Sequence, residues 1–320
     1  MRRCPGFSLV ELLVAVAIIG LLLALIFPAM NATREAARRT QCQNNVRRIG
    51  LAVLNHASAH KETLPDALRN DSWGLRNLMD YDYVKARGGS PRPFSWRATI
   101  LPYLEEQAMH DRLNVANDPI ARQNRDALEG MVLPVYQCPT RSRNRLSWIG
   151  SPLTRPEEAY MLGTADYHAT VHVVIFDPSN WTLDNLKDGA WKYFRKFNRP
   201  NSRPRRMGNA SRPSRARLAK VTDGLSKTIL IRESDAWYDP WVAEWPFGYI
   251  EDTYRSDVFV IGQTDDFTNA GAVQFFGNHS TGGNFAMCDG SVRFMSAESD
   301  HLILQAMGTR AGGESVRLHE

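Results

Sequence analysis

The first 30 residues contain an apolar run that constrains the fold more than any other part of the chain. Between Phe7 and Met30, a stretch of 24 residues, the only charged side chain is Glu11. At about 1.5 Å per residue, a helix of that length reaches roughly 36 Å, enough to cross a hydrocarbon core of about 30 Å. The run therefore predicts one membrane-spanning helix, preceded by a short basic head that contains Arg2 and Arg3.

Glu11 is the informative residue within this run. A carboxylate inside a spanning helix costs about 2.5–3.5 kcal/mol on insertion scales and usually marks a function. If the chain is cut after Gly6, the new amine of Phe7 lies one helical turn from Glu11, on the same face. The carboxylate could pair with that amine or with the amine of a neighbouring copy. The alternative is an ordinary signal anchor, in which the glutamate has no role.

The junction between head and helix has the sequence Gly6-Phe7-Ser8-Leu9-Val10-Glu11-Leu12-Leu13-Val14. This motif resembles the cleavage and methylation motif of type IV prepilins and pseudopilins. The resemblance implies that a prepilin peptidase cuts after Gly6 and methylates the amine of Phe7, and that Glu11 serves filament assembly. Pro28 matches a helix-loosening proline of such subunits, and a proline does remove one helical hydrogen bond.

The charges around the apolar run disagree about its orientation. Arg2 and Arg3 favour a cytoplasmic N-terminus, whereas Arg34, Arg38 and Arg39 follow the run and favour the opposite. A short head without acidic residues resembles a prepilin leader, and this resemblance favours the cytoplasmic N-terminus. We expect a single-pass protein of the cell inner membrane with a cytoplasmic N-terminus and a periplasmic body, or an extracellular body within a filament.

The positive charge of the chain is concentrated in one segment. Eleven Lys or Arg and no acidic residue lie between Lys192 and Lys220, and the remainder carries 28 basic against 34 acidic residues. The simpler interpretation of this segment is a solvated loop. The alternative is binding of an anionic polymer, such as DNA or polysaccharide, or of lipid headgroups, through Arg203, Arg205 and Arg206.

Beyond Pro28 the apolar residues return at three- and four-residue spacing. This pattern predicts one helix from Phe7 to about His60, broken at Pro28, whose second half packs one face against a globular body. Further segments are predicted by composition and turn residues. The expected helices are Leu75–Tyr83 and Ser95–Leu113 with a break at Pro102, and the expected strands are Val132–Cys138, Ala169–Phe176 and Thr228–Ile231.

A hairpin is predicted near the C-terminus. Asp289-Gly290 as a two-residue turn would pair Met287 with Val292 and Phe285 with Phe294. These four side chains would then share one face, which predicts a hairpin with a single apolar side that covers a helix.

The chain has four cysteines: Cys4 in the head, then Cys42, Cys138 and Cys288. An exported body allows one disulfide. A bond between Cys42 and Cys138 would join the long helix to the body, but the alternative of two buried thiols stays open because sequence supplies no Cα separation.

No catalytic, cofactor or metal site is expected. His56 and His60 are one helical turn apart, and His168 and His172 could share a strand face, but neither pair has the flanking ligands of a zinc motif. Asp265 and Asp266 with Asn269 could contribute to a calcium loop, but their spacing is not that of an EF-hand. An aromatic stretch is better explained by packing than by ligand binding. The sets considered were His56 with His60, His168 with His172, Asp265 and Asp266 with Asn269, His279 and Ser280 with Asp289, and residues 237–249.

Short motifs extend the resemblance over the body. In order they are Cys42-Gln43-Asn44-Asn45, Ile49-Gly50-Leu51-Ala52, Ser95-Trp96, Leu101-Pro102-Tyr103-Leu104-Glu105, Tyr136-Gln137-Cys138-Pro139, Thr222-Asp223-Gly224-Leu225-Ser226-Lys227-Thr228-Ile229-Leu230, Asn278-His279, Gly282-Gly283-Asn284 and Asp289-Gly290-Ser291-Val292. Together they resemble a large family of prepilin-like proteins of planctomycete-type bacteria, whose long C-terminal domain has no assigned function. Cys288 departs from the small residue expected there, which favours an unpaired thiol.

The expected fold is α+β and pilin-like: a long N-terminal transmembrane helix packed on an antiparallel β-sheet in an enlarged exported domain. We expect a leader at 1–6, an assembly helix at 7–30, its exported continuation at 31–62, and a globular domain at 63–320 with the basic loop at about 192–220. The resemblance implies a non-enzymatic subunit of a type IV pilus or type II secretion-like filament. Its expected partners are prepilin peptidase, other pilin subunits and membrane lipid. The alternative is a membrane-anchored receptor that never polymerises.

Overall fold

The computed structural model describes residues 9–65, 94–114, 122–140, 146–149, 160–170, 172–175, 186–188, 216–233, 258–261, 279, 281–296, 298–299, 301–311 and 313. Several predicted features lie outside these residues. They are the cleavage site at Gly6 and Phe7, the helix at 75–83, most of the basic segment with Arg203, Arg205 and Arg206, the aromatic stretch at 237–249, the acidic loop at Asp265, Asp266 and Asn269, and Ser280.

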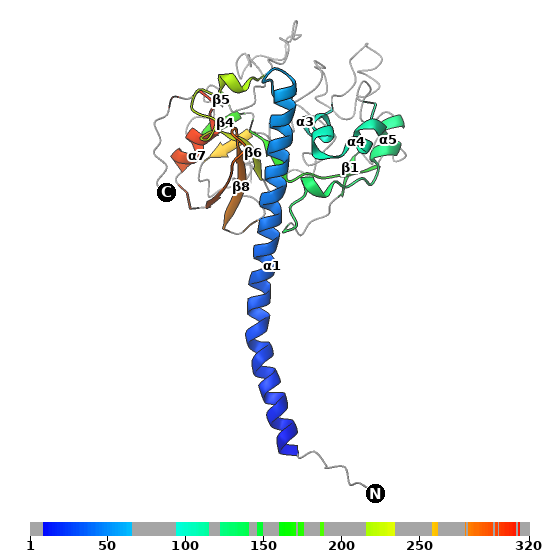
Figure 1. Ribbon diagram of the computed structural model, residues 1–320, viewed down its shortest axis with the longest axis vertical. Coiled ribbons are helices and arrows are strands. Elements are labelled where there is room, and N and C mark those ends of the chain that lie inside the picture. Colours follow the sequence, from blue (N-terminus) through cyan, green and yellow to red (C-terminus); the bar gives the residue numbers. More distant parts are fainter. Residues whose placement is uncertain are drawn as a thin grey trace, which may run out of the picture.

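A single helix, α1 (Leu9–Ala59), forms the axis of the molecule and extends far beyond the body (Figure 1). Among the described residues it is the helix long and apolar enough to cross a membrane, and none of that apolar stretch is buried. The leucines there are open to the surroundings, with Leu9 78% and Leu25 67% exposed. A soluble monomer rarely leaves so large an apolar surface uncovered, which favours a membrane anchor.

The predicted break at Pro28 is wrong. Helix α1 is continuous through Pro28 and only curves gently along its exposed half (Figure 1). A proline removes one N–H donor and crowds the preceding turn, but the residues on both sides keep their own helical hydrogen bonds. The helix therefore curves and does not break.

The second half of α1 packs against the body on both sides. Its buried positions recur at three- and four-residue steps, as the periodicity predicts. It contacts the strands β6 (Ile229–Glu233), β8 (Gly282–Met287) and β9 (Val292–Ser296) on one side. On the other it meets the short helices η2 (Leu101–Leu104) and η3 (Pro134–Tyr136).

The central sheet has four antiparallel strands in the order β3-β6-β8-β9, where β3 spans Tyr167–Ala169. Helix α1 covers one face, where Ala286 joins the main core. Helix α7 (His301–Gly308) covers the other, where Phe285 and Met287 pack with Leu304 and Met307. A helix-backed antiparallel sheet with a long apolar N-terminal helix confirms the α+β, pilin-like fold.

Two smaller sheets lie beside this layer. The strands β5 (Leu186–Asp188), β4 (His172–Ile175) and β7 (Val258–Ile261) form one, in which β4 and β7 are parallel. The strands β1 (Leu146–Ile149) and β2 (Tyr160–Gly163) form the other. The single strand predicted at 169–176 is thus divided between β3 and β4, because β-branched residues predict extended backbone but not its partner.

The predicted register of the β8–β9 hairpin is wrong by one residue. Ala286 pairs with Val292 and Phe285 with Arg293. The loop has three residues rather than two: the Met287 N–H donates to the Ser291 carbonyl at 2.8 Å, and Gly290 has φ 85°. A left-handed glycine after a turn is the usual form of a three-residue hairpin loop. As a result both faces of β8 are buried, and the predicted single apolar side is also wrong.

Proline explains two other local outcomes. The segment predicted as a strand at 132–138 contains the 3₁₀ helix η3, because Pro134 fixes its φ at the first helical position and the Tyr136 N–H donates to Leu133 O at 3.0 Å. The predicted break at Pro102 is confirmed. The helical segment there is divided into α3 (Trp96–Thr99), η2 and α4 (Gln107–Arg112), and α5 (Arg122–Leu128) follows.

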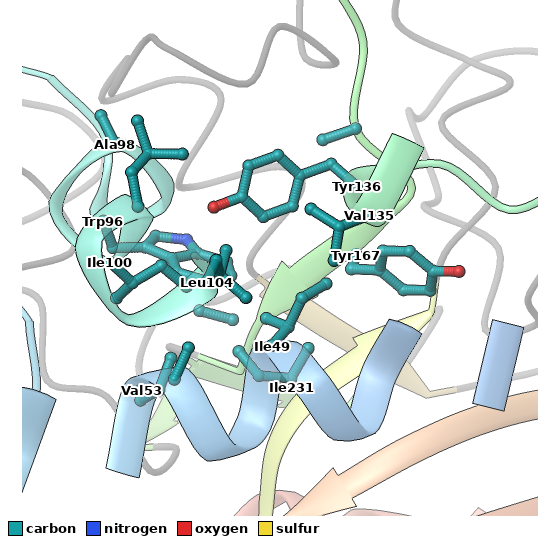
Figure 2. Close-up of a cluster of buried hydrophobic side chains, with 14 of the residues drawn as sticks. Ile49, Val53, Trp96, Ala98, Ile100, Leu104, Val135, Tyr136, Tyr167 and Ile231 are labelled. Atoms are coloured by element: carbon teal, nitrogen blue, oxygen red, sulfur yellow. The ribbon is translucent and has the colours of Figure 1, made fainter. Parts of the chain in front are cut away.

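The main core lies where these short helices meet α1 (Figure 2). Ile49 and Val53 of α1 pack there with Trp96, whose side chain is fully buried. The Tyr136 hydroxyl donates to the Arg97 carbonyl at 2.7 Å, and burial raises the pKa of that phenol far above its usual range. The core therefore holds the second half of α1 between the sheet and the helices.

Candidate functional site

The exposed half of α1 is the first candidate site. Glu11 lies in the first turn of α1 and is exposed, within a surface otherwise formed by apolar side chains. Such a surface is suited to lipid or to the same helix of a neighbouring subunit. Gly6 and Phe7, which precede it, lie outside the described residues.

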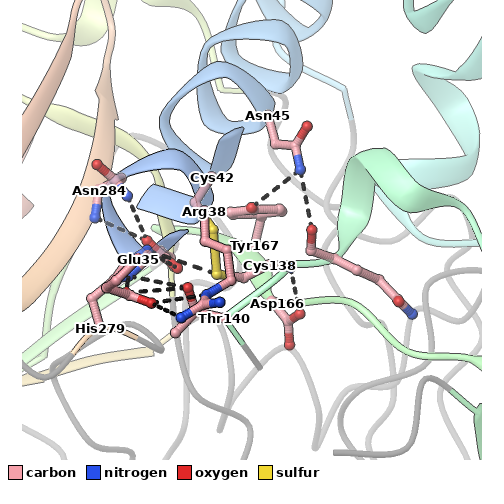
Figure 3. Close-up of polar contacts among 12 residues, drawn as sticks. Glu35, Arg38, Cys42, Asn45, Cys138, Thr140, Asp166, Tyr167, His279 and Asn284 are labelled. Atoms are coloured by element: carbon pink, nitrogen blue, oxygen red, sulfur yellow. Dashed lines mark hydrogen bonds and ion pairs between the residues drawn. A yellow bond between two sulfur atoms is a disulfide. The ribbon is translucent and has the colours of Figure 1, made fainter. Parts of the chain in front are cut away.

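The second candidate site is a group of four buried side chains and one partly exposed glutamate where α1 enters the body, which we name the cysteine–histidine cluster. It consists of Glu35, Cys42, Cys138, Glu233 and His279. Figure 3 shows Glu35, Cys42, Cys138 and His279. The first two lie on α1, the third follows η3, the fourth ends β6 and the last precedes β8.

In the structure Cys42 and Cys138 form a disulfide, with their Cα atoms 5.3 Å apart and a sequence separation of 96. The bond joins α1 to the body at the point where the helix leaves it. The Cys138 N–H donates to the Asp166 carboxylate at 2.8 Å, which fixes the backbone beside the bond. Cys288 is free and buried, and burial raises the pKa of its thiol far above its usual range.

His279 lies between two carboxylates. Its Nδ1 donates to Glu35 at 2.9 Å, and its Nε2 lies 3.4 Å from Glu233 and 3.8 Å from the Cys138 sulfur. Partial burial raises the pKa of Glu35, but hydrogen bonds from His279 and Arg38 outweigh this and leave it below its usual value. His279 is 4% exposed, so its contacts with Glu233 and Cys138 form largely without competing water.

Glu233 is fully buried, with 0% exposure. Its Oε2 accepts hydrogen bonds from the backbone N–H and the side-chain amide of Asn284, at 3.1 and 2.9 Å. These bonds orient the other oxygen toward His279. A fully buried carboxylate requires such partners, because its desolvation is otherwise very costly.

Asn45 is a structural residue that sequence analysis missed. It lies in the apolar stripe of α1, and its side-chain amide donates to Gln137 O at 3.1 Å and to the Tyr167 hydroxyl at 3.4 Å. A polar residue within an apolar helical stripe is the signal that could have identified it. Asn45 attaches α1 to the segment that carries Cys138.

The structure brings one of the two histidine pairs considered in the sequence together and separates the other. His56 and His60 stack with ring centroids 4.0 Å apart, and burial together with the charge of His60 lowers the pKa of His56 to about 4. His168 lies in β3 and contacts Arg97 at 3.0 Å, whereas His172 lies in β4 of another sheet. His168 and His172 therefore lie on strands of different sheets and do not share a strand face.

The hairpin turn residues have structural partners. Asp289 accepts hydrogen bonds from the Ser291 N–H and hydroxyl at 2.9 and 2.7 Å, and its own N–H donates to Leu225 O at 3.1 Å. The Cys288 N–H donates to Thr228 O at 2.9 Å. The motif around Asp223-Gly224 thus contacts the hairpin loop. The motifs containing Cys42, Cys138 and His279 meet at the cysteine–histidine cluster.

The exposed apolar helix and the sheet behind it define a prepilin-like precursor with a large C-terminal domain. Two family models match the chain: "Prokaryotic N-terminal methylation motif" over residues 1–27 and "Protein of unknown function (DUF1559)" over residues 31–302. The chain belongs to the DUF1559 family and begins with the prepilin methylation motif. No curated protein and no solved structure matches it.

Proposed function

We propose that this protein is a structural subunit, major or minor, of a type IV pilus or a type II secretion-like filament, with no enzymatic role. One observation carries the proposal: the methylation motif leads directly into an exposed apolar helix that continues without a break into the body. In this arrangement the exposed half of α1 is the assembly element and the body provides the outer surface.

The proposed mechanism begins in the inner membrane. Prepilin peptidase cuts after Gly6 and methylates Phe7, which leaves a cationic amine one turn from Glu11. Helices of neighbouring subunits then pack along their exposed apolar halves, with Glu11 facing the amine of a neighbour. In hydrocarbon this ion pair is screened far less than in water, so assembly would depend on prior cleavage. The orientation follows the leader: N-terminus cytoplasmic, body periplasmic or within the filament.

Replacement of Glu11 tests this mechanism. Glu11→Ala should be cleaved and methylated normally, while incorporation into filaments should fall by at least about tenfold, the equivalent of about 1.4 kcal/mol. The measurement is quantitative immunoblotting of sheared filament and membrane fractions. Leu12→Ala is the matched control, because it changes an adjacent exposed residue of α1 and keeps the carboxylate; it should assemble normally.

Mass spectrometry of the mature N-terminus gives an independent check of the processing step. The expected terminus is N-methylated Phe7. An intact Met1, or an unmodified terminus elsewhere, would contradict the filament proposal. Normal processing combined with unchanged incorporation of Glu11→Ala would favour the membrane-anchored receptor instead.

A further inference from the structure

The cysteine–histidine cluster contains four potential metal ligands of three chemical types. One ligand atom from each of Cys42, Cys138, Glu233 and His279 lies within 4.8 Å of each of the others, and all four residues are buried. Two sulfurs, one imidazole nitrogen and one carboxylate oxygen form a donor set that suits tetrahedral zinc. The sequence does not reveal the set, because its members come from four separate segments.

We propose that reduction of the Cys42–Cys138 disulfide converts the cluster into a zinc site, with Cys42, Cys138, Glu233 and His279 as ligands. The oxidised chain holds the disulfide and the reduced chain holds the metal. The two states exclude each other, because each sulfur uses the same electrons for the disulfide bond or for the ion. The inference is independent of filament assembly.

The hydrogen bonds around the cluster support this assignment. In zinc sites the ring nitrogen that does not bind the metal donates to a carboxylate or carbonyl, which fixes the tautomer and the ring orientation. His279 has this arrangement: Nδ1 donates to Glu35 at 2.9 Å, and Nε2 is left on the side of the Cys138 sulfur and Glu233. Asn284 orients Glu233 in the same manner through its Oε2.

Charge and burial favour a dication in the reduced state. Two thiolates and a carboxylate in a buried site would repel one another and lose their hydration. A zinc ion offsets most of that charge, and four protein ligands complete a tetrahedral shell without an open position. The proposed site is therefore structural rather than catalytic.

The chemistry balances with a dithiol as reductant. The dithiol transfers two electrons and two protons to the sulfur–sulfur bond and becomes a disulfide, leaving thiols at Cys42 and Cys138. Each thiol then releases one proton when it binds the ion. Zinc binding should accordingly weaken as the pH falls.

The test uses the full-length chain in detergent, with Cys4→Ser to remove the head thiol. The protein is reduced with a water-soluble phosphine, desalted without oxygen, and titrated with Zn²⁺ against a chromophoric chelator. We expect one zinc per chain when reduced, and binding at least about 100-fold weaker when oxidised. Co²⁺ in place of zinc should give thiolate-to-cobalt charge-transfer absorption and tetrahedral d–d bands, and Ca²⁺ should not compete.

Variants assign the ligands. His279→Ala and Glu233→Ala should lose zinc binding, whereas Cys288→Ser, which changes a buried thiol outside the cluster, should keep it. Glu35→Ala should weaken zinc binding by about 10–100-fold, the usual effect of removing an outer hydrogen bond. Because Glu35 is 41% exposed, this variant decides the question if the buried variants do not fold, as judged by circular dichroism. Equal zinc affinity of oxidised and reduced protein, or a cobalt complex without thiolate absorption, would overturn the proposal.

Discussion

At the scale of single residues, Gly50 determines how closely α1 approaches the sheet. A Cβ atom added at this position would lie 2.9 Å from the Cβ of Ala286 on β8, nearer than two such atoms can pack. The absence of a side chain therefore allows the helix backbone to lie directly against the methyl group of Ala286. Composition alone does not show this, because glycine inside a helix usually only lowers its stability.

Gly50→Ala should destabilise the body. Overpacking of a core contact costs about 1–3 kcal/mol, and the better helix propensity of alanine returns about 0.5–1 kcal/mol. We expect a net loss of about 1–2 kcal/mol in the free energy of unfolding, measured by urea titration of the full chain in detergent with tryptophan fluorescence. Gly20→Ala is the control on the same helix, where an added Cβ meets nothing within 4 Å. Equal midpoints for both variants would show that the close approach is not required.

At the scale of elements, the β8–β9 hairpin depends on a three-residue loop that rests on α1. Gly290 has φ 85°, and a Cβ there would lie 3.2 Å from Leu54 and 3.4 Å from Leu51. The close approach of Gly290 to Leu51 and Leu54 joins the loop to α1, the same helix that the strands of the hairpin cover. The three-residue loop therefore fixes both the register of the hairpin and its position on α1.

Gly290→Ala should cost about 1–3 kcal/mol, because the left-handed backbone is strained with a side chain and the leucines must shift. Gly130→Ala separates the two causes. Gly130 has a similar φ of 69°, but an added Cβ there meets nothing within 4 Å. The difference between the two variants in urea unfolding measures the contact with α1. If Gly130→Ala were as destabilising as Gly290→Ala, that contact would contribute nothing.

At the scale of the whole molecule, the Cys42–Cys138 disulfide joins the membrane-proximal part of α1 to the body across 96 positions of sequence. Closing so long a loop lowers the entropy of the unfolded chain. The bond therefore stabilises the folded body and fixes the direction in which the exposed helix leaves it.

Cys42→Ala with Cys138→Ala should lower the free energy of unfolding by about 2–4 kcal/mol, the typical contribution of a disulfide. The measurement is urea unfolding with a strong chelator present, so that no metal replaces the bond. Addition of a phosphine reductant should destabilise the wild type by a similar amount and leave the double variant unchanged. A reductant effect of equal size on both proteins would place the stabilisation elsewhere.

The amino-acid sequence by itself determined the features that depend on neighbours along the chain. Composition, spacing and turn chemistry predict the apolar run, the length of α1, the buried strand around Ile229–Leu230, the break at Pro102 and the position of the turn at Asp289-Gly290. These properties depend on contacts within a few residues, so a local pattern is sufficient to predict them. The methylation motif is identified by its resemblance to that of prepilins.

Only the tertiary structure decided which distant segments meet. Packing of the whole body brings together Cys42, Cys138, Glu233 and His279. It also divides one predicted strand between two sheets and shifts the register of the hairpin by one residue. The continuity of α1 through Pro28 was likewise not apparent from the sequence. The partners of a buried side chain can lie far away in the sequence, 244 positions in the case of Glu35 and His279, and a local pattern carries no information about their placement.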